Sequence, residues 1–175
     1  MSSFEGTPVD VVAAIAKYSS EAALGLGSCI YVSEATNLAT IPAPGAGTSI
    51  VSTDITMDSS KVFFPWRISD TDVEFSSNAV GAKGSQSFRN VCTVFIPVSR
   101  DVVDTIMNGT LNDEFVLIVP DKKGEYYIFG TEFAPAQIAE GGVQKVLNNE
   151  RNGTLITFEY LGHMPYRYTG AIPLT

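Results

Sequence analysis

Two apolar runs joined by a turn constrain the fold of this chain more than any other feature. Residues 115–119 read Phe-Val-Leu-Ile-Val, and residues 125–130 read Glu-Tyr-Tyr-Ile-Phe-Gly. Between them lies a Pro-Asp-Lys-Lys-Gly segment at 120–124. Runs rich in β-branched and aromatic residues on either side of a Pro-Asp…Gly turn are typical of a β-hairpin. The pattern therefore predicts two antiparallel strands between residues 115 and 130.

Further apolar and alternating segments predict more strands. The strongest is 90–98, and Pro65 makes 61–68 suitable only for an edge or a bulge. Asn152-Gly153 predicts a turn, as does the glycine-rich segment 81–85. The remaining predicted strands are 28–33, 50–57, 61–68, 72–76, 133–138, 141–147, 154–161 and 166–172.

Two segments favour helices instead. Residues 9–18 follow Thr7-Pro8, a capping hydroxyl and a proline at the first helical position, and carry apolar residues one turn apart. Residues 99–108 begin at Ser99, a capping residue, and end before Gly109, a common helix stop. The sequence thus predicts an N-terminal helix and one short helix between strong strands.

These elements predict a mainly β fold: a β-sandwich or open barrel of about nine or ten strands. One short helix is expected to pack on its side, in addition to the N-terminal helix. The chain has 175 residues, a length that favours one domain over residues 1–175 and a core needing no metal or disulfide. Residues 35–48, rich in Ala, Pro, Gly and Thr, predict a long loop, and loops of this length are often functional.

The charge balance excludes several classes of protein. Eleven basic against 19 acidic residues give a net charge of -8, which disfavours a protein that grips nucleic-acid phosphates. Only 17% of residues are charged, a low share that suggests a surface largely covered by another chain, although compact β-proteins have the same feature. The N-terminus has no secretory pattern, and no apolar stretch is long enough to span a membrane. Without export, Cys29 and Cys92 are expected to be reduced thiols.

The candidate catalytic and metal-binding residues stand singly in the sequence, without partners. His163 is the only histidine, and its neighbours in the sequence supply neither a catalytic triad nor a metal site. Four aspartates offer oxygens for a hard cation but lack the pattern of a calcium loop, and they are interpreted as turns or strand ends. They are Asp54, Asp58, Asp70 and Asp72.

Three further patterns are equally weak. Glu159 has the apolar neighbours that a glycosidase acid requires, but strand alternation can point it to solvent. Residues 81–85 faintly resemble a phosphate loop but lack its spacing and its helix. Four aromatic residues are candidates for a sugar-binding platform: Trp66, Tyr126, Tyr166 and Tyr168. No catalytic, cofactor-binding or metal-binding residue is therefore assigned, and no enzyme or cofactor is expected.

The chain resembles bacteriophage tail tube proteins, especially small ones from phages of gut Bacteroidetes. The resemblance lies in the succession of a strand at 90–98, a short helix at 99–108 and the hairpin at 115–130. A closing strand at 154–161 followed by Met-Pro-Tyr is similar as well, as is the Pro/Gly loop at 35–48, where the family often has an inter-ring contact loop. The N-terminal helix departs from the simplest layout of the family.

The resemblance implies a virion structural protein that assembles into stacked hexameric rings. The sheets of the subunits would join into an inner β-barrel, and the stacked rings would conduct DNA without sequence-specific binding. The expected partners are copies of the chain and other virion proteins, not a membrane. The expected location is the phage tail, with assembly in the host cytoplasm. An acidic wall would suit the passage of DNA.

Two alternatives remain open from the sequence. The first is another phage structural protein, such as a tail terminator, a connector or a capsid decoration protein. The second is a β-sandwich module that binds carbohydrate or a small ligand through its aromatic residues.

Overall fold

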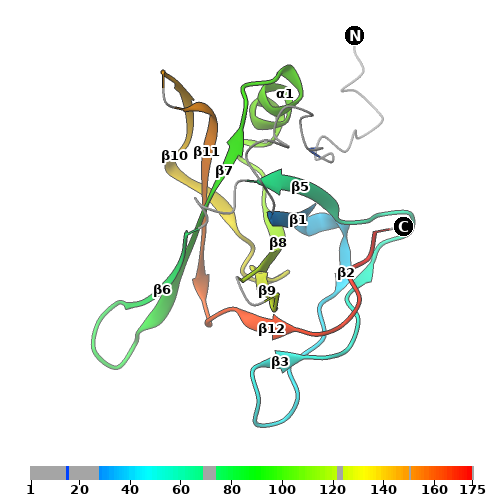
Figure 1. The fold of residues 1–175 in the computed structure, drawn as a ribbon. Coiled ribbons are helices and arrows are strands. Elements are labelled where there is room, and N and C mark those ends of the chain that lie inside the picture. The colour runs from blue at the N-terminus through cyan, green and yellow to red at the C-terminus, as the bar shows by residue number, and fades with distance from the viewer. Residues whose placement is uncertain (1–14, 16–27, 69–73, 122–123, 150, 175) are drawn as a thin grey trace.

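A computed structural model describes residues 15, 28–68, 74–121, 124–149 and 151–174 of the chain (Figure 1). Twelve strands and one α-helix follow one another in this part, so the mainly β prediction is confirmed. The strands are β1 Ser28–Glu34, β2 Leu38–Thr40, β3 Ile50–Val51, β4 Thr56–Met57, β5 Phe64–Ile68, β6 Glu74–Val80, β7 Ser87–Pro97, β8 Phe115–Pro120, β9 Tyr126–Phe129, β10 Gln137–Leu147, β11 Asn152–Gly162 and β12 Tyr166–Tyr168.

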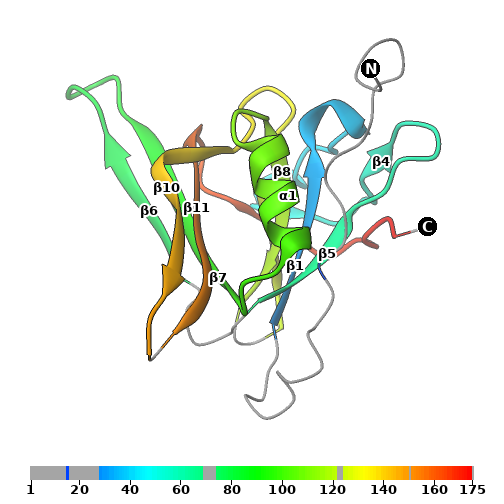
Figure 2. The same cartoon turned by 90° about the horizontal axis from the view of Figure 1, so that it is seen from above.

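The strands form three sheets. A six-stranded sheet has the order β3-β12-β9-β8-β1-β5, and a four-stranded antiparallel sheet has the order β10-β11-β7-β6. A small sheet pairs β2 with β4. Figures 1 and 2 show the two larger sheets as separate layers, with helix α1 between their upper ends. This is the sandwich of the sequence-based prediction.

The predicted hairpin lies in the middle of the larger sheet. β8 pairs with β9 from Leu117↔Phe129 to Pro120↔Tyr126, as the sequence predicts. Successive residues of a strand point to opposite faces, yet all five residues of β8 from 115 to 119 are buried. This strand is therefore covered on both faces, which explains its unbroken apolar run.

Two apolar clusters cover these two faces. One lies between the two larger sheets and includes Trp66, Phe115 and Phe158, with Ile156 and Val94 from the four-stranded sheet. The other lies on the far face of the six-stranded sheet, where Val116, Ile118 and Ile128 pack against residues such as Leu38, Val51 and Phe63. β5, which contains Pro65, is an edge strand of the six-stranded sheet, as expected.

The short helix is found two residues later than predicted. α1 spans Asp101–Thr110, and Val103, Ile106 and Met107 form its buried stripe. Ser99 does not cap it, because Arg100 takes the N-cap position and the Ser99 amide donates to Asn152 Oδ1 at 2.9 Å. Gly109 lies inside the last turn and does not end the helix. The stripe was predictable from the sequence, whereas the exact ends depended on contacts with β11.

Several strand boundaries also differ from the predictions. The predicted strand 50–57 is two short strands, β3 and β4, which lie in different sheets. Segments 133–138 and 141–147 contribute to one strand, β10, whose register shifts between Ile138 and Val143. The predicted loop 35–48 begins with a 3-10 turn, Ala35–Asn37, and with β2, so the stretch without regular structure is 41–49.

The predicted N-terminal helix lies outside the described residues, except at Ile15. There the backbone forms a parallel β-bridge with Trp66, and the Ile15 side chain is buried. No helix in the described part of the chain is long and apolar enough to cross a membrane.

Candidate assembly surface

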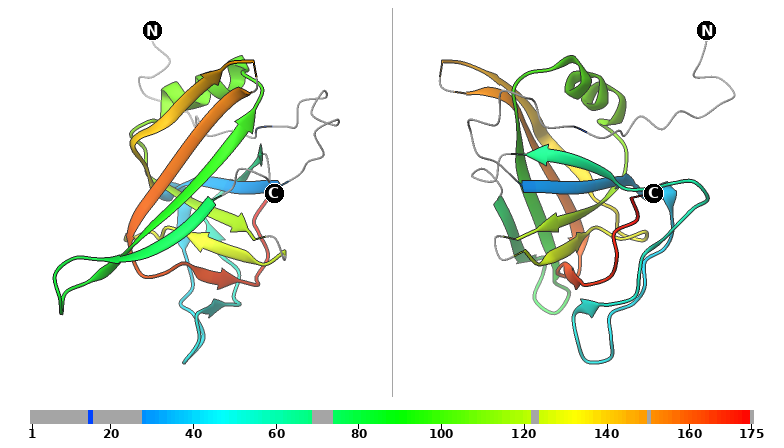
Figure 3. Two further views of the ribbon diagram at one scale, coloured as in Figure 1. Left: turned by 60° about the vertical axis from the view of Figure 1, so that its left-hand side comes forward. Right: turned by 45° about the vertical axis from the view of Figure 1, so that its right-hand side comes forward.

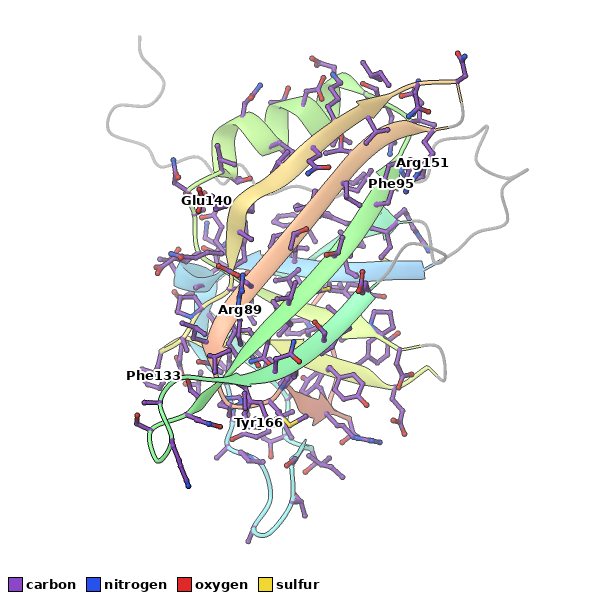
Figure 4. All side chains as sticks on the ribbon, turned by 90° about the vertical axis from the view of Figure 1, so that its left-hand side faces the viewer. Arg89, Phe95, Phe133, Glu140, Arg151 and Tyr166 are labelled. Atoms are coloured by element: carbon purple, nitrogen blue, oxygen red, sulfur yellow. The ribbon has the colours of Figure 1, made fainter. Side chains whose placement is uncertain are left out.

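The four-stranded sheet has one face turned toward the core and one turned away. The direct partners Ile156↔Val94 and Phe158↔Cys92 lie in the core. Because side chains alternate along a strand, the intervening pairs point outward. Figure 4 looks onto this side of the sheet, and no described strand or helix lies in front of it. We call it the outer face; its residues include Glu74, Ser76, Arg89, Val91, Thr93, Phe95, Gln144, Leu155, Thr157, Glu159 and Leu161.

The outer face carries little free charge. Arg89 donates to Glu159 Oε2 at 2.7 Å, so that its two central charges pair. The hydroxyls of Thr93 and Thr157 lie 3.2 Å apart on neighbouring strands. This central row is therefore polar and neutral.

At the upper end of the outer face, one aromatic ring is covered by a cation. The guanidinium of Arg151 lies 4.0 Å from the centre of the Phe95 ring, which is only 5% exposed. A side chain at Gly153 would place its Cβ 2.6 Å from this ring and 2.3 Å from the Ile96 carbonyl oxygen. The absence of a side chain at position 153 thus allows Phe95 to lie flat on the sheet.

The sheet ends in two strands that have one partner each. In the described part of the chain, β6 pairs only with β7, and β10 pairs only with β11. An unpaired edge offers a row of N–H and C=O groups to any further strand. β10 is interrupted by its bulge, where Gly141 adopts a φ of +67°. β6 has no bulge, and its register with β7 is regular from Glu74 to Val80.

β6 and β7 continue beyond the sandwich as a projecting hairpin, which Figures 1 and 3 show leaving the body of the molecule. We call residues 78–88 the hairpin arm. Its turn is the one predicted at 81–85, where the Ser85 amide donates to the Ala82 carbonyl at 2.9 Å. Gly81 and Gly84 have φ values of +111° and +91°, which glycine adopts readily. Residues 81–87 are all exposed.

The base of the arm is fixed by a buried polar network. Asn90, fully buried on β7, accepts a hydrogen bond from the Ser77 hydroxyl at 2.5 Å. Its side-chain amide donates to the His163 carbonyl oxygen at 3.0 Å, and the Tyr160 hydroxyl donates to the same oxygen at 3.0 Å. Burial raises the pKa of Tyr160, which favours the protonated, hydrogen-bond-donating form of its hydroxyl. The network joins β6, β7, β11 and the turn after β11.

The only histidine contributes its backbone to this network, while its ring lies at the surface. The ring stacks on Tyr166 with centroids 4.1 Å apart, and Nδ1 lies 2.7 Å from the Met164 carbonyl oxygen. The prediction of a turn or strand-end histidine fits this geometry. The described residues contain no cluster of three or more His, Cys, Asp or Glu side chains able to hold a metal ion.

The other sequence candidates are dispersed. Glu159 lies on the outer face beside Arg89 and not in an apolar pocket. Asp54 Oδ1 accepts the Ala171 amide at 2.8 Å, which ties the C-terminal segment to the loop before β4. The Asp58 amide donates to the Asn37 carbonyl at 2.9 Å, while Asp70 and Asp72 lie outside the described residues.

The four aromatic candidates for a sugar-binding platform differ in their exposure. Trp66 is fully buried in the core, and Tyr168 is only 3% exposed. Tyr126 and Tyr166 pack against the second apolar cluster and are partly buried. Trp66 and Tyr168 therefore do not line a sugar-binding surface, because their rings fill the interior.

The sequence patterns did not single out Asn90 and Ser77, nor Phe133, which is highly exposed in the segment between β9 and β10. A signal for Asn90 was present, since it occupies an inward position of a strand whose other inward residues are apolar. No comparable signal marks Phe133, because exposure of one aromatic residue in a loop depends on how the loop is folded.

The arrangement described here is suited to association through sheet edges. In the described part of the chain, neither edge of the four-stranded sheet pairs with a further strand, and no other element covers its outer face. Comparison with protein-family models, with curated proteins and with solved structures finds no match to this chain.

Proposed function

We propose that this chain is a structural protein of a bacteriophage virion, most specifically the subunit of the tail tube. Its role would be assembly, not catalysis: copies join into rings, six to a ring, and the rings stack into a tube that conducts DNA. The resemblance of the hairpin, helix and closing strands to tail tube proteins suggests this role. The observation that carries the proposal is the four-stranded sheet, whose edge strands β6 and β10 have no second partner strand among the described residues.

The strand directions support closure into a ring. Neighbouring strands in the order β10-β11-β7-β6 are antiparallel throughout, so β6 and β10 run in opposite directions. Copies related by rotation about an axis keep the same orientation. β6 of one copy therefore meets β10 of the next copy as an antiparallel partner, and the alternation continues across the junction. Such a head-to-tail contact generates a ring where the rotation closes.

The chemistry of the two faces supports the same arrangement. The inner face of the four-stranded sheet is already covered by the six-stranded sheet and α1. The outer face would then form the wall of the channel. Its Thr, Ser and Gln residues and its paired Arg89–Glu159 ions supply little positive charge for phosphate groups. DNA would pass along such a wall without being held.

Electron microscopy of the purified chain over a range of concentrations tests the proposal. Rings and stacked tubes are expected, together with light-scattering masses that are multiples of the 18.7 kDa chain. A chain that remains monomeric at the highest concentrations, without rings, contradicts the proposal. Single rings that never stack would instead favour a terminator or connector.

Two proline variants test whether the edge of β6 makes the contact. Asn78 and Ala79 are consecutive exposed residues, so one N–H points toward β7 and the other points outward. Proline removes the N–H in each case. One of the two variants, Asn78→Pro or Ala79→Pro, removes only the outward N–H and should therefore keep the stability of the wild type. This variant is expected to lose assembly. The other variant serves as its matched control. Normal rings from the stable variant would rule out pairing through this edge.

A further inference from the structure

Phe133 is the most exposed large apolar side chain in the described part of the molecule. It is 93% exposed, in the segment that connects β9 with β10. The hydration of a phenylalanine ring exposed to this degree is unfavourable, and such rings often mark contact surfaces. Figure 4 shows Phe133 near the lower end of the four-stranded sheet.

The exposure of Phe133 is imposed by a well-connected turn. The Thr131 amide donates to the Ala134 carbonyl at 3.1 Å, and the Ala134 amide donates to Thr131 Oγ1 at 2.9 Å. Two residues later, Ala136 exchanges two backbone hydrogen bonds of 2.8 Å with Phe115 of β8. The backbone on both sides of Phe133 is therefore fixed, and the ring is held outward.

Other exposed apolar residues lie near this turn. A Cβ at Gly162 would lie 3.7 Å from the Ala134 Cβ, so the turn packs against the end of β11. Leu161 beside it is 58% exposed, and Met164 is 52% exposed. Phe133 thus lies at the end of the sheet that also carries these two exposed apolar side chains.

The hairpin arm, which projects from the body of its own chain, also lacks packing. A two-stranded ribbon without further packing is only marginally stable, yet the arm projects from the body with residues 81–87 exposed. Ala79 and Phe88 are direct cross-strand partners on its inner face, with Ala79 exposed and Phe88 half-buried. This pair offers a small apolar surface on the side of the sheet that faces the sandwich.

We propose that Phe133 of one copy docks against the hairpin arm of the next copy. This inference rests on the proposed ring, in which β6 of one copy pairs with β10 of its neighbour. In antiparallel pairing, the C-terminal end of β6, which leads into the arm, meets the N-terminal end of β10. Phe133 precedes the first residue of β10 by four positions, so the pairing brings it to the base of the arm.

The side of the sheet is consistent as well. The segment that carries Phe133 comes from β9 of the six-stranded sheet and therefore approaches β10 from the inner side. Ala79 and Phe88 lie on the same inner side of the arm. The contact would cover the exposed ring and would supply the arm with the packing that its own chain does not provide.

The first test compares Phe133→Ser with Leu174→Ser, a matched substitution of a 46% exposed residue near the C-terminus. Full-length proteins are compared by light scattering and electron microscopy over a series of concentrations. Phe133→Ser is expected to raise the concentration of half-maximal assembly by about tenfold or more, because burial of a phenylalanine side chain is lost. Its melting temperature should equal that of the wild type. Equal assembly of both variants overturns the inference.

The second test locates the contact. Phe133→Cys and Ala79→Cys are made separately in a Cys29→Ser background, mixed, and treated with a short bismaleimide. A cross-linked dimer is expected from the mixture and not from either variant alone. A mixture of Leu174→Cys and Ala79→Cys is the control.

The outcomes separate this inference from the proposed ring. Rings that form normally without this cross-link overturn the docking contact and leave the ring intact. A wild-type chain that forms no rings overturns both. Assembly weakened by Phe133→Ser but without the cross-link overturns the docking site as well, because Phe133 would then contact another surface.

Discussion

Removal of the Asn90 side chain is expected to destabilise the fold more than removal of the Ser77 hydroxyl. Asn90 is fully buried and makes two hydrogen bonds, one from the Ser77 hydroxyl at 2.5 Å and one to the His163 carbonyl at 3.0 Å. Each such bond contributes about 0.5–1.5 kcal/mol net, and a polar group left without its partner adds to the loss. Asn90→Ala is therefore expected to lower the free energy of unfolding by about 2–3 kcal/mol.

Three further variants allow the loss of stability to be compared within the same network. Ser77→Ala removes one of the two bonds and is expected to cost about 1 kcal/mol. The double variant should cost less than the sum of the single variants, because the Ser77–Asn90 bond is counted in both. Asn90→Asp should be as destabilising as Asn90→Ala or more so, because it places a carboxylate against the His163 carbonyl in a buried site.

Urea unfolding at a protein concentration below that of assembly provides the measurement. Trp66 is the only tryptophan and is fully buried, so its fluorescence reports exposure of the core. The midpoint and slope of the transition give the free energy of unfolding. A loss below about 0.5 kcal/mol for Asn90→Ala, or strict additivity with Ser77→Ala, would refute the network as a structural tie.

Two further predictions concern the packing of the sheet and its thiols. Gly153→Ala is expected to lower the free energy of unfolding by about 1–3 kcal/mol, because the new Cβ would lie 2.3 Å from a backbone oxygen. Gly45→Ala is the near-neutral control in the same unfolding assay, because its Cβ would approach only the Thr48 hydroxyl, at 3.2 Å. A comparable loss in both variants would argue against this close approach. Burial raises the pKa of the Cys92 thiol to about 12, so a thiol reagent at pH 8 should modify half-buried Cys29 first and Cys92 only after unfolding. Equal rates for the two thiols in the folded protein would contradict the placement of Cys92.

The elements that the sequence predicts well are those determined by local pattern. The hairpin 115–130 follows from two apolar runs and one turn, and the stripe of α1 follows from its four-residue spacing. A strand that is buried on both faces needs an unbroken apolar run. β8 is such a strand, and its residues 115–119 provide the run.

The sequence-based predictions fail where contacts between residues far apart in the sequence determine the structure. Asn152-Gly153 resembles a hairpin turn, but both residues lie in β11, and Gly153 pairs with Pro97 and Val146. The actual turn is formed at Asn148, whose Oδ1 accepts a hydrogen bond from the Arg151 amide at 2.7 Å and whose own amide donates to the Arg151 carbonyl at 2.9 Å. Gly153 is required because Phe95 and Ile96 of β7 approach it closely, and no local pattern contains that information.

The same limit applies to the candidate surface. Sequence composition indicates a covered surface through its low charge, but it does not indicate which strands end a sheet. Strand order depends on pairings between residues far apart, such as β11 with β7. The two free edges, the hairpin arm and Phe133 therefore emerge only from the three-dimensional arrangement.

The location of the charge changes the physical argument for DNA passage. The net charge of -8 suggests an acidic wall that repels phosphate. On the outer face, however, Glu159 is paired with Arg89, and Arg151 lies over the Phe95 ring. Strong binding to DNA requires several Lys or Arg side chains that displace counterions from phosphates, and this face does not present such a set among its described residues. In the proposed tube, DNA would slide because the wall offers few cations to hold it, and a strongly acidic lining would not be necessary.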